Sequence, residues 1–409
     1  MKVACAVLLC VLAATVMAED LLMPGETWES GYIPVRGEGN ELFYFLVKSR
    51  DKNPQAPLVI WLNGGPGCSS GYGLFMENGP WMIHKKTLKF FNNSYSWNSF
   101  ADMIFVDQPV QVGFSLVKSD NDLCINQTCV TNDFYSFMLK FLERYPQYEK
   151  RPLYITGESY GGHYIPTIGA RFARSKNPKI NLKGIAVGNP FTSMEVQMGV
   201  YPYYLYENKN FTTLTYVLSK VSMLLCQIGH FAKLEPTLLT SICDFSLVGM
   251  MTLPNGYDIR ENSSYDKMDE VLMSKYNNTE IQKLIGAKKV NMSMCNDTIY
   301  NLFSVDLATS VSPDIEYLVD NNVDVMLYFG DKDYMCNWRG GEALVNSLNW
   351  HGTAEFLKTQ MKEWIGGKYR KFDNFIFMVI YDAGHMVPMD QGKVSLDMIK
   401  TFIDRSFKA

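Results

Sequence analysis

The chain has 409 residues, of which 47% are hydrophobic and 13% aromatic, with 38 basic and 42 acidic side chains. This length is enough for a large hydrophobic core, and the low charge with many aromatic residues excludes a disordered chain. The formal net charge of -4 argues against a nucleic-acid-binding protein, because such proteins present a basic surface to the phosphate backbone.

Residues 1–18 have the features of a secretory signal peptide. Lys2 precedes an apolar stretch, and Val16-Met17-Ala18 places small residues where a signal peptidase cleaves. The stretch is shorter than the ~20 apolar residues that a membrane span needs, and no later segment is long and apolar enough. We therefore expect a secretory-pathway protein without a membrane span, destined for the lysosome, the vacuole or the outside of the cell.

Loss of this leader would leave seven cysteines. An odd number in an oxidising compartment predicts three disulfides and one free thiol. Cys124 and Cys129 lie close enough for a local loop, and Cys226 could pair with Cys243. Zinc is the competing explanation of these pairs, but no further Cys or His stands beside them at ligand spacing, so we predict no metal and no cofactor.

Asn-x-Ser/Thr triplets agree with secretion. Five of the seven fall between residues 210 and 296, which indicates a region with much exposed surface. The candidate glycosylation sites are Asn92, Asn126, Asn210, Asn262, Asn277, Asn291 and Asn296.

Short β-rich runs alternate with helical patterns, which is typical of a mostly parallel central sheet flanked by helices. A helix over residues 132–145 has apolar residues at helical spacing and stops at Pro146, and a closing helix is expected over 394–402. The predicted strands are residues 42–47, 58–62, 103–106, 153–156, 185–187, 325–329 and 375–380.

The segment 191–312 interrupts this alternation. It carries most of the triplets, two cysteines and helical stretches such as 214–231. We interpret it as an inserted helical cap over the carboxyl edge of the sheet, with residues 19–190 and 313–409 forming the α/β domain.

Gly157-Glu158-Ser159-Tyr160-Gly161 follows a predicted strand and precedes a helical segment. A Gly-x-Ser-x-Gly string in this context forms a tight turn that exposes the serine hydroxyl above the sheet. Ser159 is therefore the candidate nucleophile.

A serine nucleophile needs a histidine base that is oriented by a carboxylate. His385 follows the strand 375–380 directly, whereas His163 lies on the helix after Ser159 and is expected to pack or hydrogen-bond. The other histidines, which have no comparable strand-end context, are His84, His230 and His351.

Asp331 and Asp333 compete for the role of the acid after the strand 325–329. Asp333 is further along the loop and can reach a histidine, while Asp331 more plausibly stabilises the turn. Ser159, Asp333 and His385 then follow the chain order of α/β-hydrolases. The absence of a His-Glu-x-x-His string disfavours a metal-dependent hydrolase.

The glycine-rich string Trp61-Leu62-Asn63-Gly64-Gly65-Pro66-Gly67-Cys68 follows the strand 58–62. Its bare backbone N–H groups could form an oxyanion hole together with the N–H of Tyr160.

At these residues the sequence resembles the serine carboxypeptidase family. The shared strings run in family order: Trp-Leu-Asn-Gly-Gly-Pro-Gly-Cys-Ser-Ser (61–70), Gly-Glu-Ser-Tyr-Gly-Gly-His-Tyr-Ile-Pro (157–166), Gly-Asp-Lys-Asp-Tyr-Met-Cys-Asn-Trp (330–338) and Ala-Gly-His-Met-Val-Pro (383–388). The resemblance implies an α/β-hydrolase fold and release of C-terminal amino acids through an acyl-enzyme on Ser159. The oxyanion N–H groups would be those of Gly65 and Tyr160.

The resemblance also implies how a substrate's terminal carboxylate is held. The implied contacts are Asn63, Glu77, Glu158 and the amide of Gly64, with Trp61 assisting. Two carboxyl groups beside a third cannot all ionise cheaply, so one of the two glutamates must be protonated to donate a hydrogen bond. Peptide binding should weaken as pH rises, which predicts an acidic optimum.

By the same resemblance, Cys68 pairs with Cys295, and Cys336 corresponds to a free thiol near the substrate pocket. Whether that thiol is reactive or buried and inert depends on its exposure and local charge. The sequence departs from the family pattern in Asp107–Leu116, where Gln111 replaces a glycine and Leu116 a tyrosine. Gln lacks the backbone freedom of Gly, so the shape of this loop is left open.

Two other functions compete with a peptidase that acts on peptide or protein C-termini. An esterase or acyltransferase of the same fold would not need the carboxylate-binding residues Asn63, Glu77 and Glu158. A non-catalytic partner protein would not need an intact Ser–Asp–His set. The resemblance permits a monomer or a homodimer.

Overall fold

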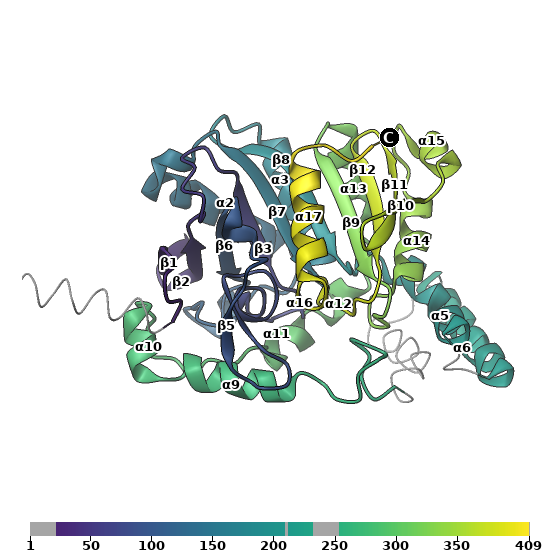
Figure 1. The fold of residues 1–409 in the computed structure, drawn as a ribbon, viewed down its shortest axis with the longest axis horizontal. Helices are drawn as coiled ribbons and strands as arrows, with labels where there is room; N and C mark the ends of the chain where they lie inside the picture. The colour runs from purple at the N-terminus through teal and green to yellow at the C-terminus, as the bar shows by residue number, and fades with distance from the viewer. Residues whose placement is uncertain (1–21, 209–211, 232–252, 409) are drawn as a thin grey trace, which may run out of the picture.

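The structure, a computed structural model, describes residues 22–208, 212–231 and 253–408 (Figure 1). Ten strands form one sheet in the order β1-β2-β6-β3-β7-β8-β9-β12-β11-β10, and β4 pairs with β5 separately. The strand bounds are β1 (Trp28–Arg36), β2 (Asn40–Val47), β3 (Leu58–Leu62), β4 (Trp81–Ile83), β5 (Phe90–Asn92), β6 (Asp102–Asp107), β7 (Pro152–Glu158), β8 (Asn181–Gly188), β9 (Asp324–Gly330), β10 (Lys362–Trp364), β11 (Gly367–Phe372) and β12 (Phe375–Ile380).

The six central strands, from β6 to β12 in the sheet order, run parallel to one another, and antiparallel strands flank them at both edges. Every residue of β3, β6, β9 and β12 is buried, as expected for parallel strands covered on both faces. The seven strands predicted from the sequence are all present, because a short continuous apolar run is buried best as a strand that is covered on both faces.

Helices cover both faces of the sheet, and each covered face forms its own hydrophobic core. One face carries α2 (Gln127–Arg144), α3 (Gly161–Ser175), α13 (Ser312–Asp320), α14 (Trp338–Ser347) and α15 (Thr353–Lys358). The other carries α17 (Gly392–Ile403), which crosses the near face of the sheet in Figure 1. Helix α2 begins five residues before the predicted position, because the Asn126 side chain caps it by accepting the Cys129 N–H.

Between β8 and α13 the described chain consists of helices joined by loops. Elsewhere the described chain has one more short helix, α16 (Val387–Asp390), and several single helical turns. These turns are Gly73–Glu77, Trp97–Ser99, Asp120–Asp122, Pro146–Tyr148 and, within this segment, Met198–Val200. Figure 1 shows α9 and α10 along one edge of the sheet, while α5 and α6 project at another corner. The helices of this segment are α4 (Met194–Gln197), α5 (Tyr201–Glu207), α6 (Thr213–Phe231), α9 (Asp266–Tyr276), α10 (Thr279–Leu284), α11 (Asp297–Leu302) and α12 (Ser304–Leu307).

Some sequence predictions lie outside the described residues: the leader 1–18, Asn210, and the pairing of Cys226 with Cys243. Among the described helices, none combines the length and the apolar character that a membrane crossing requires.

The topology gathers the predicted site at one edge of the sheet. Asn63 follows β3, Ser159 follows β7, Asp333 lies after β9 and His385 after β12. Because parallel strands end at the same edge, these residues, distant in sequence, face one crevice.

Candidate active site

Ser159 occupies a strained turn between β7 and α3. Its φ angle is +60°, a left-handed conformation that few non-glycine residues adopt, and its N–H donates to the Gly188 carbonyl at 3.0 Å. A Cβ atom at Gly157 would lie 2.0 Å from the Leu62 carbonyl oxygen, and one at Gly162 would lie 2.5 Å from the Phe191 oxygen. At Gly161 the nearest atoms would be 3.3 Å away, so Gly162, which the sequence reasoning overlooked, is under the tighter constraint.

The structure brings Asp333 and His385 together. The Asp333 Oδ2 atom lies 2.7 Å from His385 Nδ1, and both side chains are buried. The same carboxylate accepts the backbone N–H groups of Met335 at 2.9 Å and Cys336 at 3.1 Å. These bonds hold the carboxylate in one orientation, which leaves Nε2 as the free edge of the imidazole.

Asp331 takes the turn-stabilising position. Its side chain pairs with Lys332 at 2.8 Å and accepts the Ala383 N–H at 3.4 Å. It therefore braces the loop that carries His385 and makes no contact with the imidazole.

Asn189 and Tyr257 support this pair and were missed by the sequence reasoning. Asn189 donates to Asp333 Oδ2 at 2.7 Å and accepts the Gly330 N–H at 3.1 Å. The Tyr257 carbonyl accepts the His385 N–H at 2.7 Å, and its ring lies 5.0 Å from the imidazole. Position after β8, at the same sheet edge, is the signal that could have pointed to Asn189.

His163 packs inside the molecule and is not the base. Its ring nitrogens lie 2.7 Å from the Phe191 carbonyl oxygen and 2.9 Å from that of Thr309, and its ring stacks on Tyr160 at 4.4 Å. It links α3 to the two loops that flank it.

The glycine-rich loop lies directly against the nucleophile turn. A Cβ atom at Gly64 would lie 2.3 Å from the Tyr160 nitrogen, and Gly65 has a φ of +105°. The loop is held by Asp107, which accepts the Ser69 hydroxyl at 2.6 Å and the Ser70 N–H at 3.1 Å. This arrangement places the backbone of Gly65 and that of Tyr160 beside Ser159.

Asn63, Glu77 and Glu158 form a buried cluster next to the nucleophile. The Asn63 amide nitrogen donates to one oxygen of each glutamate, at 3.0 Å in both cases. Its carbonyl oxygen accepts the Trp61 indole N–H at 2.8 Å and the Gly73 N–H at 2.9 Å. Trp61 therefore fixes the amide of Asn63 so that its nitrogen faces the two carboxyl groups.

The two buried glutamates lie together on the same amide nitrogen, so ionising both is costly and the pair retains a proton. Burial raises the pKa of Glu77 to about 7. Burial and the neighbouring Glu77 also raise the pKa of Glu158. One proton is thus retained on the pair under mildly acidic conditions.

Two cavities meet at Ser159. One, of about 230 Å³, contains Asn63, Gly64, Glu158 and His385. The other, of about 320 Å³, is lined by the oxyanion candidates and by apolar side chains such as Met194 and Met198. Ser159 and Gly65 border both, so a chain crossing from one cavity to the other passes over Ser159.

Comparison with known proteins identifies the family. The sequence model described as serine carboxypeptidase matches residues 23–405. The chain belongs to the serine carboxypeptidase family. It is 33% identical over 387 residues to serine carboxypeptidase-like 47 of Arabidopsis thaliana, covering 89% of this chain and 75% of that protein. It is 37% identical over 406 residues to carboxypeptidase Y homolog A of Podospora anserina, covering 91% and 71%.

Solved structures agree on the fold. Kex1(Δ)p, a prohormone-processing carboxypeptidase from Saccharomyces cerevisiae, has a TM-score of 0.82 at 23% identity and covers 93% of this chain and 92% of its own. A proline iminopeptidase from Mycobacterium smegmatis has a TM-score of 0.51 at 12% identity, covering 92% and 98%. The chain thus has the α/β-hydrolase fold of a serine carboxypeptidase.

The described part of this serine carboxypeptidase holds two disulfides and one free thiol, and one of the disulfides and the thiol line the cavities at the site. Cys68 in the glycine-rich loop is bonded to Cys295, and Cys124 to Cys129. Cys336 is a free, buried thiol that lines the larger cavity. Burial raises the pKa of that thiol, so it stays protonated and is a weak nucleophile.

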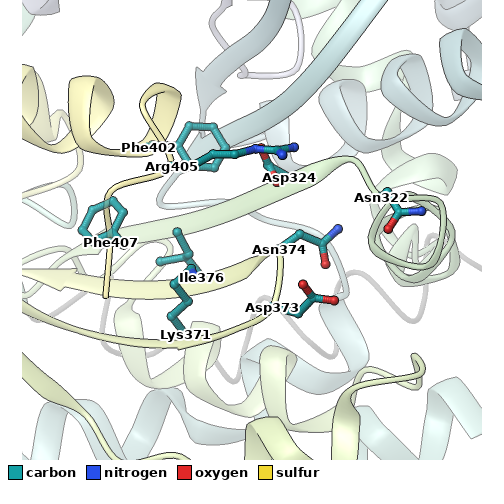
Figure 2. A pocket seen from close by; sticks show the side chains of 9 residues that line it. All are labelled: Asn322, Asp324, Lys371, Asp373, Asn374, Ile376, Phe402, Arg405 and Phe407. Carbon is teal, nitrogen blue, oxygen red and sulfur yellow. The ribbon is translucent and has the colours of Figure 1, made fainter. Parts of the chain in front are cut away.

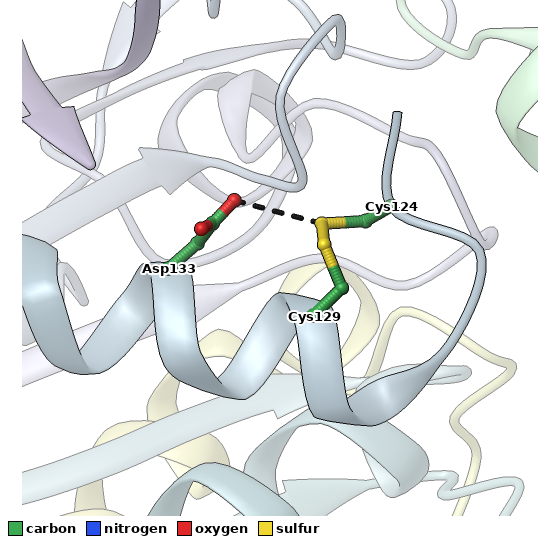
Figure 3. Close-up of side chains that lie close together, drawn as sticks. All are labelled: Cys124, Cys129 and Asp133. Atoms are coloured by element: carbon green, nitrogen blue, oxygen red, sulfur yellow. Dashed lines mark hydrogen bonds between the residues drawn. A yellow bond between two sulfur atoms is a disulfide. The ribbon is translucent and has the colours of Figure 1, made fainter. Parts of the chain in front are cut away.

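Two groups of side chains have ligand atoms close enough for a metal ion. In one, Cys124 and Cys129 are bonded to each other and Asp133 pairs with Arg36 at 2.6 Å, so neither sulfur is a thiolate ligand (Figure 3). In the other, Asp333 and His385 are already engaged with each other beside Cys336. Neither group resembles a built metal site.

A further hollow of about 200 Å³ lies at the opposite edge of the sheet (Figure 2). It lies where β9 and β12 begin, between Asp324, Asn374 and the chain after α17. Arg405 pairs with Asp324 there at 2.7 Å, and no member of the Ser–Asp–His set lines it. Ligands of α/β sheets bind at the other edge, so this hollow is not the active site.

The structure describes both residues that depart from the family pattern, Gln111 and Leu116. Gln111 adopts a φ of +74°, the conformation that a glycine would take without strain, and its carbonyl accepts the Asn296 amide at 2.9 Å. Leu116 forms an isolated antiparallel bridge with Glu41 of β2, in which the backbone N–H of each residue donates to the carbonyl of the other. The loop therefore keeps the shape that favours glycine, at a cost in backbone strain.

The described glycosylation candidates differ in exposure. The side chain of Asn277 bonds the backbone of Met292, and the side chain of Asn296 caps α11. Both are half-buried, so a glycan there would compete with these contacts. The exposed asparagines are Asn92, Asn126, Asn262 and Asn291.

Proposed function

We propose that this protein is a serine carboxypeptidase that releases amino acids from peptide C-termini at acidic pH, with Ser159 as nucleophile. The observation that carries the proposal is that His385, bonded to Asp333, lines one cavity together with Ser159, Asn63 and Glu158. Asp333 acts as the acid that orients His385, and His385 as the base.

The reaction proceeds in two halves. Ser159 Oγ attacks the last peptide carbonyl while His385 Nε2 takes its proton, and the N–H groups of Gly65 and Tyr160 stabilise the oxyanion. The C–N bond then breaks, and His385 returns the proton to the departing amine. Water, deprotonated by His385, attacks the ester on Ser159 and releases the shortened peptide.

The carboxylate-binding cluster distinguishes this activity from that of an esterase or acyltransferase. The Gly64 N–H and the protonated member of the Glu77–Glu158 pair supply hydrogen-bond donors for a free α-carboxylate, and Asn63 contributes by turning toward the substrate one of the two amide hydrogens that it gives to the glutamates. A substrate without that carboxylate leaves these buried groups unpaired, which costs binding energy. The bonded Asp333–His385 pair in reach of the cavity that Ser159 lines argues against a purely non-catalytic partner protein.

Residues 191–312 are proposed as a cap subdomain inserted into the catalytic domain formed by 19–190 and 313–409. Support comes from Tyr160, whose hydroxyl donates to Asp306 of α12 at 2.5 Å and so joins the nucleophile turn to this segment. The leader 1–18 and two disulfides fit a secretory compartment. We place the protein in the lysosome, the vacuole or outside the cell, as a monomer or a homodimer.

Release of amino acids from N-blocked dipeptides, between about pH 4 and 7, tests the function. The Ser159→Ala variant should lose about a thousandfold or more in kcat, because the nucleophile is gone while the fold remains. An N-blocked dipeptide amide, which lacks the α-carboxylate, is the matched control and should be a poorer substrate. Equal activity of wild type and Ser159→Ala would refute the proposal.

A further inference from the structure

The loop that carries His385 is held by contacts from the proposed cap. This loop, which we call the histidine loop, consists of residues 381–386 and connects β12 to α16 without forming a helix or a strand. Because it has no regular ladder of hydrogen bonds, the groups that bond its backbone fix its conformation. One such bond runs from the His385 N–H to the Tyr257 carbonyl, at 2.7 Å. Tyr257 belongs to residues 255–260, which we call the bracing segment.

The bracing segment also bonds the loop that carries Asp333. The Gly256 carbonyl accepts the Tyr334 N–H at 3.0 Å. Three residues further on, the Ile259 N–H donates to the Lys332 carbonyl, also at 3.0 Å. The bracing segment therefore contacts both loops, so that the acid and the base are held against one common element.

Arg260 fastens the bracing segment to the histidine loop. Its guanidinium donates to both carboxylate oxygens of Asp258, at 2.9 and 2.6 Å, and that carboxylate is fully buried. Its Nη1 atom donates to the Asp382 carbonyl at 2.8 Å, and Nη2 also donates to Asp390 Oδ2 at 3.1 Å. The same Asp390 oxygen accepts the N–H of Gly384, the residue directly before the histidine, at 2.7 Å. These contacts use the planar fork of a guanidinium, which a lysine ammonium does not have.

We propose that Arg260 is a positioning residue that keeps His385 aligned with Ser159. Because the proposed function makes His385 the base, this positioning role rests on it. Arg260 lines neither cavity and acts through the backbone, which it anchors at two points just before the histidine. Loss of these bonds lets the histidine loop shift, and a misplacement of about 1 Å at reacting groups can cost about a hundredfold in rate.

Arg405 offers a matched comparison. It also pairs with a buried carboxylate, that of Asp324, at 2.7 Å, but it does so in the hollow at the opposite edge of the sheet. Its removal costs an ion pair of the same kind without touching the histidine loop or the bracing segment. A purely stabilising role of Arg260 would give the two variants the same kinetics.

Kinetics of wild type, Arg260→Ala and Arg405→Ala on an N-blocked dipeptide test the proposal. Arg260→Ala should lower kcat about 10- to 100-fold and keep KM within about threefold of wild type, because the carboxylate-binding cluster is untouched. Arg405→Ala should keep kcat within about twofold of wild type. Arg260→Lys should give an intermediate kcat, since it keeps the charge without the fork, and it carries the same comparison if Arg260→Ala does not fold.

Methylguanidinium supplies a readout that a general loss of stability does not move. The Arg260 side chain is 35% exposed, so a small guanidinium ion can reach the space that alanine leaves. At millimolar concentration it should raise the kcat of Arg260→Ala severalfold and leave the kcat of wild type and Arg405→Ala unchanged. Methylammonium, which carries the same charge without the fork, should raise it less.

The possible results separate the role of Arg260 from the proposed function. A kcat of Arg260→Ala equal to that of wild type, or a loss no larger than that of Arg405→Ala, would overturn the positioning role and leave the carboxypeptidase activity standing. A loss of kcat that methylguanidinium does not restore would show a role in folding alone and would also overturn it. If wild type released no amino acid from any dipeptide, the proposed function itself would fail.

Discussion

Glu77 and Glu158 share one proton beside Asn63, and substrate binding should follow that proton. Burial and the neighbouring Glu77 raise the pKa of Glu158, so the pair keeps a proton above the usual range of a glutamate and loses it only as pH rises further. KM for a peptide should therefore rise with pH as the pair loses its last proton, because two ionised glutamates repel the substrate carboxylate.

Glu158→Gln tests this residue-scale prediction. The amide donates at every pH and carries no charge, so the rise in KM should shift upward or disappear, with little change in kcat. Steady-state kinetics from pH 5 to 8 on an N-blocked dipeptide measure the effect, and the corresponding ester, which lacks the carboxylate, is the control. An identical KM profile in wild type and variant would contradict the role given to the pair.

The residues proposed to carry the chemistry could be named from the sequence because each stands at the end of a recognisable strand within a distinctive string. The residues that support them could not. Tyr257 supports His385 through a contact between segments far apart in the chain, and nothing in its immediate sequence marks it, whereas Asn189 has only its position after β8 as a signal. Such contacts become visible only once the fold brings the segments together.

Among the connecting elements, the turn from Asp107 to Phe114 carries a measurable strain. Gln111 has a φ of +74°, which costs a non-glycine residue about 1–2 kcal/mol, partly offset by the extra flexibility of an unfolded glycine. Gln111→Gly should raise the free energy of unfolding by about 0.5–1 kcal/mol, since Asn296 bonds only the backbone carbonyl of this residue.

Denaturant unfolding measures this gain. Gln55→Gly is the matched control, because Gln55 is also exposed in a turn but is not among the residues with positive φ. It should leave stability unchanged or lower it. A loss of stability in Gln111→Gly comparable with that of the control would show that the turn is not strained.

The buried central strands were predictable from their apolar runs, and the edge strands were not. β1 and β11 mix polar and apolar residues and are only partly buried, so their pairing depends on neighbours that the local sequence does not reveal. The π-helical turn Gly73–Glu77 was also not expected. It forms where Gly73 meets the Trp61 ring too closely for any side chain, and this approach brings Glu77 to Asn63.

At the scale of the molecule, the Cys68–Cys295 bond closes a loop of 227 residues. The double variant Cys68→Ser/Cys295→Ser should lose about 2–5 kcal/mol of unfolding free energy, because the unfolded chain gains freedom. Activity should fall as well, since Cys68 lies in the glycine-rich loop. Thermal unfolding and kcat measure both effects.

The second disulfide is the control for this prediction. Cys124 and Cys129 are only five residues apart, so Cys124→Ser/Cys129→Ser should cost less stability and leave kcat nearly unchanged. Equal losses in the two double variants would show that loop length and the position near the site do not govern the effect.

The order of strands in the sheet has one more consequence. β1 to β8, with Ser159, come from the first half of the chain, and β9 to β12, with Asp333 and His385, come from the second. A protease that nicked the backbone once between Ser159 and Cys295 would produce two polypeptides, each holding part of the catalytic set. They would remain one covalent molecule through Cys68–Cys295 and would separate on a gel only after reduction.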